Sequence, residues 1–195
     1  MSIEDFIDFH TNFFIPAYSD LVAYIADKPQ QIIFEIENTF SHLMVYHSNP
    51  DQSIKDSNLN KAYNHLLRAT MDCYKMLWSE MSTNLDSIFK ENNSFLFFND
   101  NQNNVMSLWI SFKRKAKEAR NEELKNVGVN FMEAICLYKE AVDIGSQILD
   151  KYDSSKHDLT KDFNFKILIK QQWLGFVFGI FAGVLGNYLF KFLGN

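Results

Sequence analysis

The sequence is poor in the residues that interrupt helices or cross-link chains. Of its 195 residues, three are proline and two are cysteine, Cys73 and Cys136. Only Gly128 and Gly145 precede the C-terminal stretch, which holds the other five of the seven glycines. Both cysteines lie within apolar helical patterns, so we expect two buried thiols in a reducing compartment rather than a disulfide framework. The scarcity of glycine and proline allows long helices.

Motifs for metal, cofactor or covalent chemistry are also missing. The five histidines form no HExxH pair, and the two cysteines are far apart in sequence, so no zinc signature exists. The chain has no P-loop, no Rossmann glycine fingerprint and no GxSxG. We therefore predict no metal, no cofactor and no catalysis carried by a recognisable motif.

Charge and the N-terminus narrow the function classes further. A net charge of −5 argues against a general nucleic-acid binder, although a local basic patch stays open. The start, MSIEDFIDF, is acidic and has no basic region before its apolar residues. We expect no cleaved secretory signal.

Helical periodicity dominates residues 1–157. Ser2 and Asp5 resemble a capping box, Pro16 interrupts or restarts the first helix, and Pro29 fits the first turn of the next. No stretch alternates with a period of two. The prediction is an all-α fold: a cytosolic helical bundle of four to five main helices, followed by a C-terminal transmembrane helix. Three stripes define the expected core: Ile33, Ile36, Phe40 and Leu43; Leu59, Tyr63, Leu66, Thr70, Cys73, Leu77 and Met81; and Phe131, Ile135, Tyr138, Val142 and Ile148. The aromatic patch FLFF, residues 95–98, must dock somewhere.

The C-terminal stretch lacks charge from Trp173 to Phe190. As a helix, its 18 residues extend about 27 Å, close to the hydrocarbon thickness of a bilayer. Trp173 and Tyr188 suit the interfaces, and Lys170 and Lys191 can extend their ammonium groups toward water from either end. A buried core helix is the alternative, but such helices are rarely apolar all round and rich in glycine. We predict a transmembrane helix at 173–192 in contact with the lipid bilayer.

Lysines predict the orientation of this helix. Lys156, Lys161, Lys166 and Lys170 precede it, in or beside a basic juxtamembrane segment at 158–172, and only Lys191 follows. The positive-inside rule places the helical domain in the cytoplasm. We expect a single-pass protein of the cell inner membrane, anchored by its C-terminus.

Small residues form a stripe on the predicted transmembrane helix. Gly175, Gly179 and Gly183 are spaced four apart, and Ala182 and Gly186 add a second small pair. Such a stripe lets another helix approach closely, which predicts a homo-oligomer. The stripe is flanked by two polar residues, Gln172 and Asn187. Simple packing is the favoured outcome, and a ring that turns the stripe toward water to form a pore is the alternative.

Two internal stretches carry polar clusters. In YNHLLRATMDCYK, His65, Arg68 and Asp72 share one helical face. A general-base and phosphate-binding cluster is one interpretation, and an Arg–Asp pair with a histidine at its edge is the favoured one. The second stretch has six basic residues between Lys113 and Lys125, interleaved with glutamates. It predicts a solvated helix face, with contact to anionic lipid headgroups or RNA as the alternative.

The stretch NLNKAYNHLLRATMDCYKMLW is similar in style to the long helices of HEPN-like bundles, which are common in bacterial antiviral systems. With one membrane helix, the architecture resembles the small membrane accessory proteins of type VI-B CRISPR loci. That resemblance implies an oligomeric membrane pore that enhances defence alongside a partner, an RNA-guided nuclease.

One departure bears on activity. Nuclease-type HEPN domains place an arginine four to six residues before a histidine, whereas the nearest match here is Lys151 before His157. Lysine does not replace a planar guanidinium. We expect a non-catalytic HEPN-like scaffold. Two alternatives stay open, a membrane-tethered HEPN-type ribonuclease and a tail-anchored helical regulator of a partner protein. The Asn-Trp-Gly-Arg stretch of Bcl-2-like regulators is missing.

Overall fold

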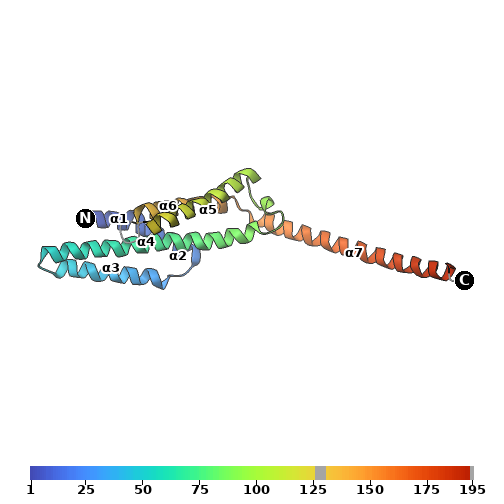
Figure 1. The fold of residues 1–195 in the computed structure, drawn as a ribbon, viewed down its shortest axis with the longest axis horizontal. Coiled ribbons are helices and arrows are strands. Elements are labelled where there is room, and N and C mark those ends of the chain that lie inside the picture. Colours follow the sequence, from blue (N-terminus) through green and yellow to red (C-terminus); the bar gives the residue numbers. More distant parts are fainter. Residues whose placement is uncertain (126–130, 194–195) are drawn as a thin grey trace. The chain divides into compact units, whose positions relative to one another are not determined.

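The described residues of the computed structural model, 1–125 and 131–193, form an all-α fold (Figure 1). Side chains are described except at 161, 163, 164, 168 and 184–193. Five main helical segments precede a long terminal helix, which confirms the predicted fold class. The elements are α1 (Ile3–Phe9), π-helical η1 (His10–Phe14), α2 (Ile15–Ile25), α3 (Gln30–Ser48), α4 (Gln52–Phe89), 3₁₀-helical η2 (Ser94–Phe97), α5 (Gln102–Lys125), α6 (Met132–Lys151) and α7 (Ser154–Leu193).

The first helical segment begins and bends as its sequence dictates. The backbone N–H of Asp5 donates to the Ser2 hydroxyl at 3.1 Å, and the Ser2 N–H donates to the Asp5 carboxylate at 2.9 Å, which confirms the capping box. Pro16 does not end the helix. Ahead of it the chain widens into the π-turn η1, where the Ile15 N–H donates to the His10 carbonyl, five residues back. A proline ring clashes with the carbonyl four residues earlier, and the wider turn accommodates it.

α4 is the central helix of the bundle and packs against α2, α3 and α6, while α5 packs against α6. Its predicted stripe is confirmed, since every member except half-buried Tyr63 is buried. The α6 stripe is confirmed from Ile135 to Ile148, with Phe131 half-buried.

The stripe predicted for α3 is displaced from the buried face. α3 buries Ile32 and Thr39, whereas Phe40 is 63% exposed. Thr39 explains the difference, because its hydroxyl donates to the Glu35 carbonyl at 2.8 Å and also lies 3.4 Å from the Ala62 carbonyl on α4. A small polar side chain that satisfies its hydrogen bonds can sit where the two backbones approach closely.

The expectation of two buried thiols is right for one cysteine only. Cys73 is buried, and burial raises the pKa of its thiol to about 12. Cys136 is exposed, which contradicts the expectation. The α6 stripe passes through Ile135 and Tyr138, and Cys136 faces away from it.

Contacts divide the chain into two units, residues 1–92 with 100–151 and residues 93–99 with 152–195. The first unit ends at Lys151, six residues before the predicted boundary. In the second unit the FLFF patch docks on the start of α7. The Asp153 N–H donates to the Phe97 carbonyl at 2.7 Å, and the Phe97 ring lies 4.3 Å from the His157 ring. Phe97 and Phe98 are buried, while Leu96 is exposed.

Candidate functional site

α7 is the leading candidate for function because one continuous helix of 40 residues carries the whole C-terminal region. The predicted juxtamembrane segment (158–172) and the predicted transmembrane helix (173–192) both lie on it. The helix begins at a polar cap: the Asp153 carboxylate accepts from the backbone N–H groups of Ser155, at 3.0 Å, and Lys156, at 3.3 Å. No break separates the charged part from the apolar part within Ser154–Leu193.

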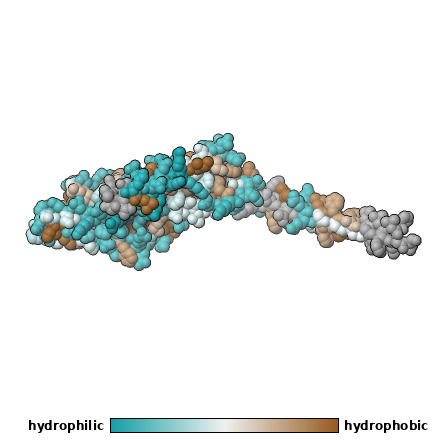
Figure 2. Space-filling view, in the orientation of Figure 1, coloured by the Kyte–Doolittle hydropathy of each residue, from teal (hydrophilic) through white to brown (hydrophobic). Residues whose placement is uncertain are grey.

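The apolar side chains of α7 have no cover. Within Ser154–Gly183 the helix is long and apolar enough to cross a membrane. No residue of its most apolar 18-residue stretch is buried. Trp173 is 65% exposed and Phe178 is 71% exposed. Figure 2 shows the hydrophobic colouring along this part of α7. Water contact with apolar surface costs about 25 cal/mol per Å², so this stretch is a candidate membrane span. A buried core helix would show the opposite exposure.

The small-residue stripe on α7 is open. A Cβ atom built on Gly175, Gly179 or Gly183 meets nothing within 4 Å, and Ala182 is exposed. The side-chain positions of Gly186 and Asn187 lie outside the described residues. In contrast, a Cβ on Gly145 in α6 would lie 2.9 Å from the Phe112 ring. Packing within the chain therefore accounts for Gly145 but not for Gly175, Gly179 or Gly183.

The structure does not assemble His65, Arg68 and Asp72 into one cluster. Nδ1 of His65 lies 2.6 Å from the Glu35 carboxylate. Asp72 accepts from the Gln31 amide at 2.5 Å and lies 3.7 Å from the Lys75 ammonium. Arg68 is exposed and forms no ion pair with a described residue. The favoured Arg68–Asp72 pair does not form, and burial raises the pKa of Asp72.

These contacts belong to a polar seam between α3 and α4. From pair to pair, the residue numbers rise along α3 and fall along α4, as expected for two antiparallel helices. The pairs are Gln31–Asp72, Glu35–His65, Thr39–Ala62 and His42–Asn58, the last at 2.8 Å. The rings of His42 and His65 also stack, with centroids 5.3 Å apart. Sequence reasoning missed the α3 members, although their spacing of four, four and three residues is a helical face.

Lys151 and His157 have separate roles. The Lys151 ammonium lies 2.7 Å from the Asp100 carboxylate and lowers its pKa. Nδ1 of His157 lies 2.5 Å from the Tyr152 hydroxyl, and its ring packs on Phe97. These contacts describe packing at helix ends: Lys151 forms an ion pair, and His157 contacts a tyrosine hydroxyl and an aromatic ring.

Most of the positive charge in the basic run of α5 is paired with carboxylates, as on an ordinary solvated helix face. Five of its six cations lie within 4 Å of a carboxylate, and Lys117 is the exception among the described residues. The pairs are Lys113–Asp86, Arg114–Glu118, Lys115–Glu118, Lys115–Glu140, Arg120–Glu123 and Lys125–Glu122.

Neither a search for metal-binding clusters nor a comparison with known proteins points to a function. Within residues 1–125 and 131–193, no group of three or more His, Cys, Asp or Glu side chains is placed to hold a metal ion. No protein-family model matches the chain, and neither a curated protein nor a solved structure is significantly similar to it.

Proposed function

We propose that this protein is a membrane-anchored, self-associating helical protein that acts without catalysis. The exposed apolar length of α7 carries the proposal, because no residue of the apolar stretch within Ser154–Gly183 is buried. A bilayer removes this surface from water and leaves every backbone hydrogen bond of the helix satisfied internally. The bundle supplies a folded domain that the anchor holds at the membrane.

Location and orientation follow from the charges beside the span. Lysines precede the apolar run at four positions and follow it at one. By the positive-inside rule, the bundle lies in the cytoplasm and the anchor crosses the inner membrane once.

Self-association rests on the open glycine stripe. Gly175, Gly179 and Gly183 present bare backbone with nothing within 4 Å of a built Cβ. In lipid, close van der Waals packing drives helix association because the tails are as apolar as the side chains. A second α7 fits this stripe, and packing with it gives the glycines a purpose that the single chain does not.

A pore is the second candidate, favoured by one observation. Gln172 is exposed at the start of the same stripe, so a ring of α7 helices with this face inward would be lined by amide and backbone groups. We further propose, on the resemblance to HEPN-like membrane accessory proteins alone, that such a pore would act in antiviral defence beside an RNA-guided nuclease. On this proposal the bundle is a scaffold, and purified protein leaves labelled single-stranded RNA intact.

The anchor is tested by charge. Phe178→Arg with Phe181→Arg places two guanidinium groups mid-span, at about 2.5–3.5 kcal/mol each, and should move the protein from the membrane to the soluble fraction. Phe34→Arg with Phe40→Arg, at exposed positions of α3, is the matched control and should leave it in the membrane. An intact chain that stays in the supernatant without detergent would falsify the proposal.

Self-association is tested with Gly179→Leu plus Gly183→Leu, which blocks close approach. We expect insertion to persist and the oligomer in detergent to disappear, as measured by crosslinking or mass photometry. Val177→Leu with Phe181→Leu, on the opposite side of the helix, is the control. Normal assembly of the glycine variant would show that the bundle drives association.

The pore is tested in living cells. Induction in bacteria with the defence partner present should depolarise the inner membrane, and the glycine variant should abolish this depolarisation.

A further inference from the structure

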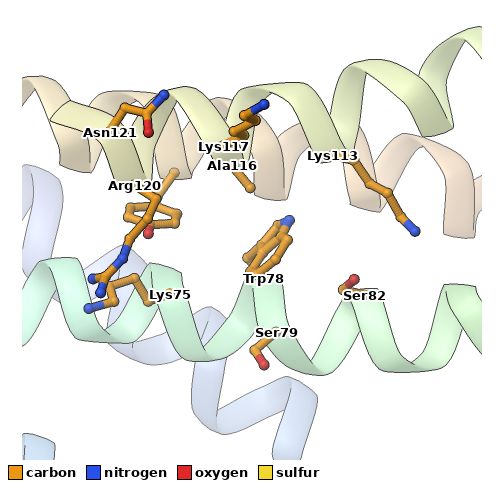
Figure 3. A pocket seen from close by; sticks show the side chains of 10 residues that line it. Lys75, Trp78, Ser79, Ser82, Lys113, Ala116, Lys117, Arg120 and Asn121 are labelled. Carbon is orange, nitrogen blue, oxygen red and sulfur yellow. The ribbon is translucent and has the colours of Figure 1, made fainter. Parts of the chain in front are cut away.

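A groove of about 660 Å³ lies between α4 and α5, with Tyr138 of α6 among its lining residues (Figure 3). Both α4 and α5 pack on α6, so the space between them stays open along one face. This volume falls in the range of small-molecule sites, about 300–1,000 Å³. The lining residues are Lys75, Trp78, Ser79, Ser82, Lys113, Ala116, Lys117, Arg120, Asn121 and Tyr138.

The lining contains four cations and no acidic residue. Lys75 and Arg120 each lie 2.8 Å from the Glu123 carboxylate. Burial alone would raise the pKa of Glu123, but hydrogen bonds from these two cations outweigh it, and the pKa is lowered. Lys113 pairs with Asp86 at 2.9 Å. Among the groove's cations, Lys117 alone has no carboxylate among the described residues, so the groove keeps a positive charge at its middle.

Trp78 supplies a second, independent observation. Its indole Nε1 is buried and has no hydrogen-bond partner among the described residues. Figure 3 shows the ring rising from α4 toward Ala116 on α5, with Lys113 and Arg120 reaching toward α4 on either side. An indole N–H is a donor only, and a buried donor without a partner costs about 1–3 kcal/mol. The groove therefore combines an unpartnered donor on α4 with an unpaired cation on α5.

We propose that this groove binds a phosphate group carried by a small organic molecule. Lys117 supplies the charge, Trp78 Nε1 donates to a phosphate oxygen, and the hydroxyl of Ser82 lines the α4 side. Donors approach from two helices, which suits the tetrahedral array of phosphate oxygens better than the planar pair of a carboxylate. The Trp78 ring and Ala116 form an apolar wall for the organic part. The proposal is independent of the membrane function proposed above.

The test uses the full chain in nanodiscs of neutral phosphatidylcholine, with ¹⁵N-labelled indole groups read by NMR. ATP, inorganic phosphate and citrate are added separately, and a fourth sample has nanodiscs containing phosphatidylglycerol. We expect ATP to shift the indole signal that is absent from Trp78→Phe. Lys117→Gln should weaken this binding about tenfold or more. Arg114→Gln, an exposed cation of the same helix outside the groove, should bind like the parent.

Each outcome either supports the phosphate site or overturns it. A saturable shift with ATP or inorganic phosphate, weakened by Lys117→Gln, supports the site with a soluble phosphate as its source. A shift only with phosphatidylglycerol, equally dependent on Lys117, supports it with a lipid headgroup as the source. The proposal is overturned by no shift with any phosphate, by equal binding of citrate, or by equal weakening in Lys117→Gln and Arg114→Gln. Lys117 is exposed, so its variant should fold as the parent does.

Discussion

α4 and α7 are the two longest helices, with 38 and 40 residues, yet they are stabilised in different ways. α4 buries thirteen residues against its neighbours and presents a polar remainder. α7 is apolar over most of its circumference after Lys170, and its candidate span buries nothing. Length therefore does not separate a core helix from an anchor. What separates them is the distribution of apolar residues. A helix that is apolar on one face packs against partner helices, whereas a helix that is apolar on all faces requires an apolar environment.

The largest expected effect comes from replacing one phenylalanine in each of the two regions by alanine. Phe112 is fully buried and contacts the α4 and α6 side of the core, so Phe112→Ala should lower the free energy of unfolding of the bundle by about 3–5 kcal/mol. Phe178→Ala on α7 should change it by less than about 0.5 kcal/mol. Chemical denaturation in non-ionic detergent, followed by tryptophan fluorescence, measures both. Comparable losses would mean that α7 is part of the folded core.

A smaller test compares glycines. In Gly145→Ala the new methyl group would lie 2.9 Å from the Phe112 ring and 3.0 Å from the Met81 sulfur. Overpacking costs about 1–3 kcal/mol, and improved helix propensity returns about 1 kcal/mol, so we expect a net loss near 1 kcal/mol in the same denaturation assay. Gly179→Ala meets no atom within 4 Å and should leave bundle stability unchanged. A stabilised Gly145→Ala variant would contradict the packing described for α6.

A third effect, of similar size, is electrostatic and depends on pH. The pKa of Glu123 is lowered from its ordinary value of 4.5, so its stabilisation is present above pH 4.5 and is lost as pH falls through the lowered value. Glu123→Gln should therefore cost about 1 kcal/mol at pH 7, and the difference from the parent should shrink below pH 4.5. Glu80→Gln, exposed on α4, is the control. A difference that is constant from pH 7 to pH 3 would exclude this ion-pair role.

Sequence periodicity was sufficient for the fold because its strongest signals come from single helices. The capping box at Ser2 and the α4 stripe depend on spacing within one element, and both are confirmed. The same holds for the apolar C-terminal run, whose lack of a polar face is visible without any partner.

Features that depend on two helices were harder to predict. The α3 face was misplaced because Thr39, a polar residue, is buried with its hydroxyl facing the Ala62 carbonyl of α4. The Arg68–Asp72 pair was expected from spacing on α4, but Asp72 meets Gln31 across the seam instead. The groove beside Trp78 combines residues about forty positions apart, and no spacing rule on one helix brings them together.

The π-turn at His10–Phe14 has a consequence for insertions and deletions. A π-turn holds one residue more than an α-turn, which shifts the buried face after it, and the buried residues Phe6, Phe9, Phe14, Ala17 and Leu21 follow that longer step. The segment therefore contains the equivalent of a single-residue insertion. Removing one residue here would leave α1 in place and rotate α2 by about 100°, turning Ala17 and Leu21 away from the core. The register of the first buried face is thus set by the π-turn, which also accommodates the ring of Pro16.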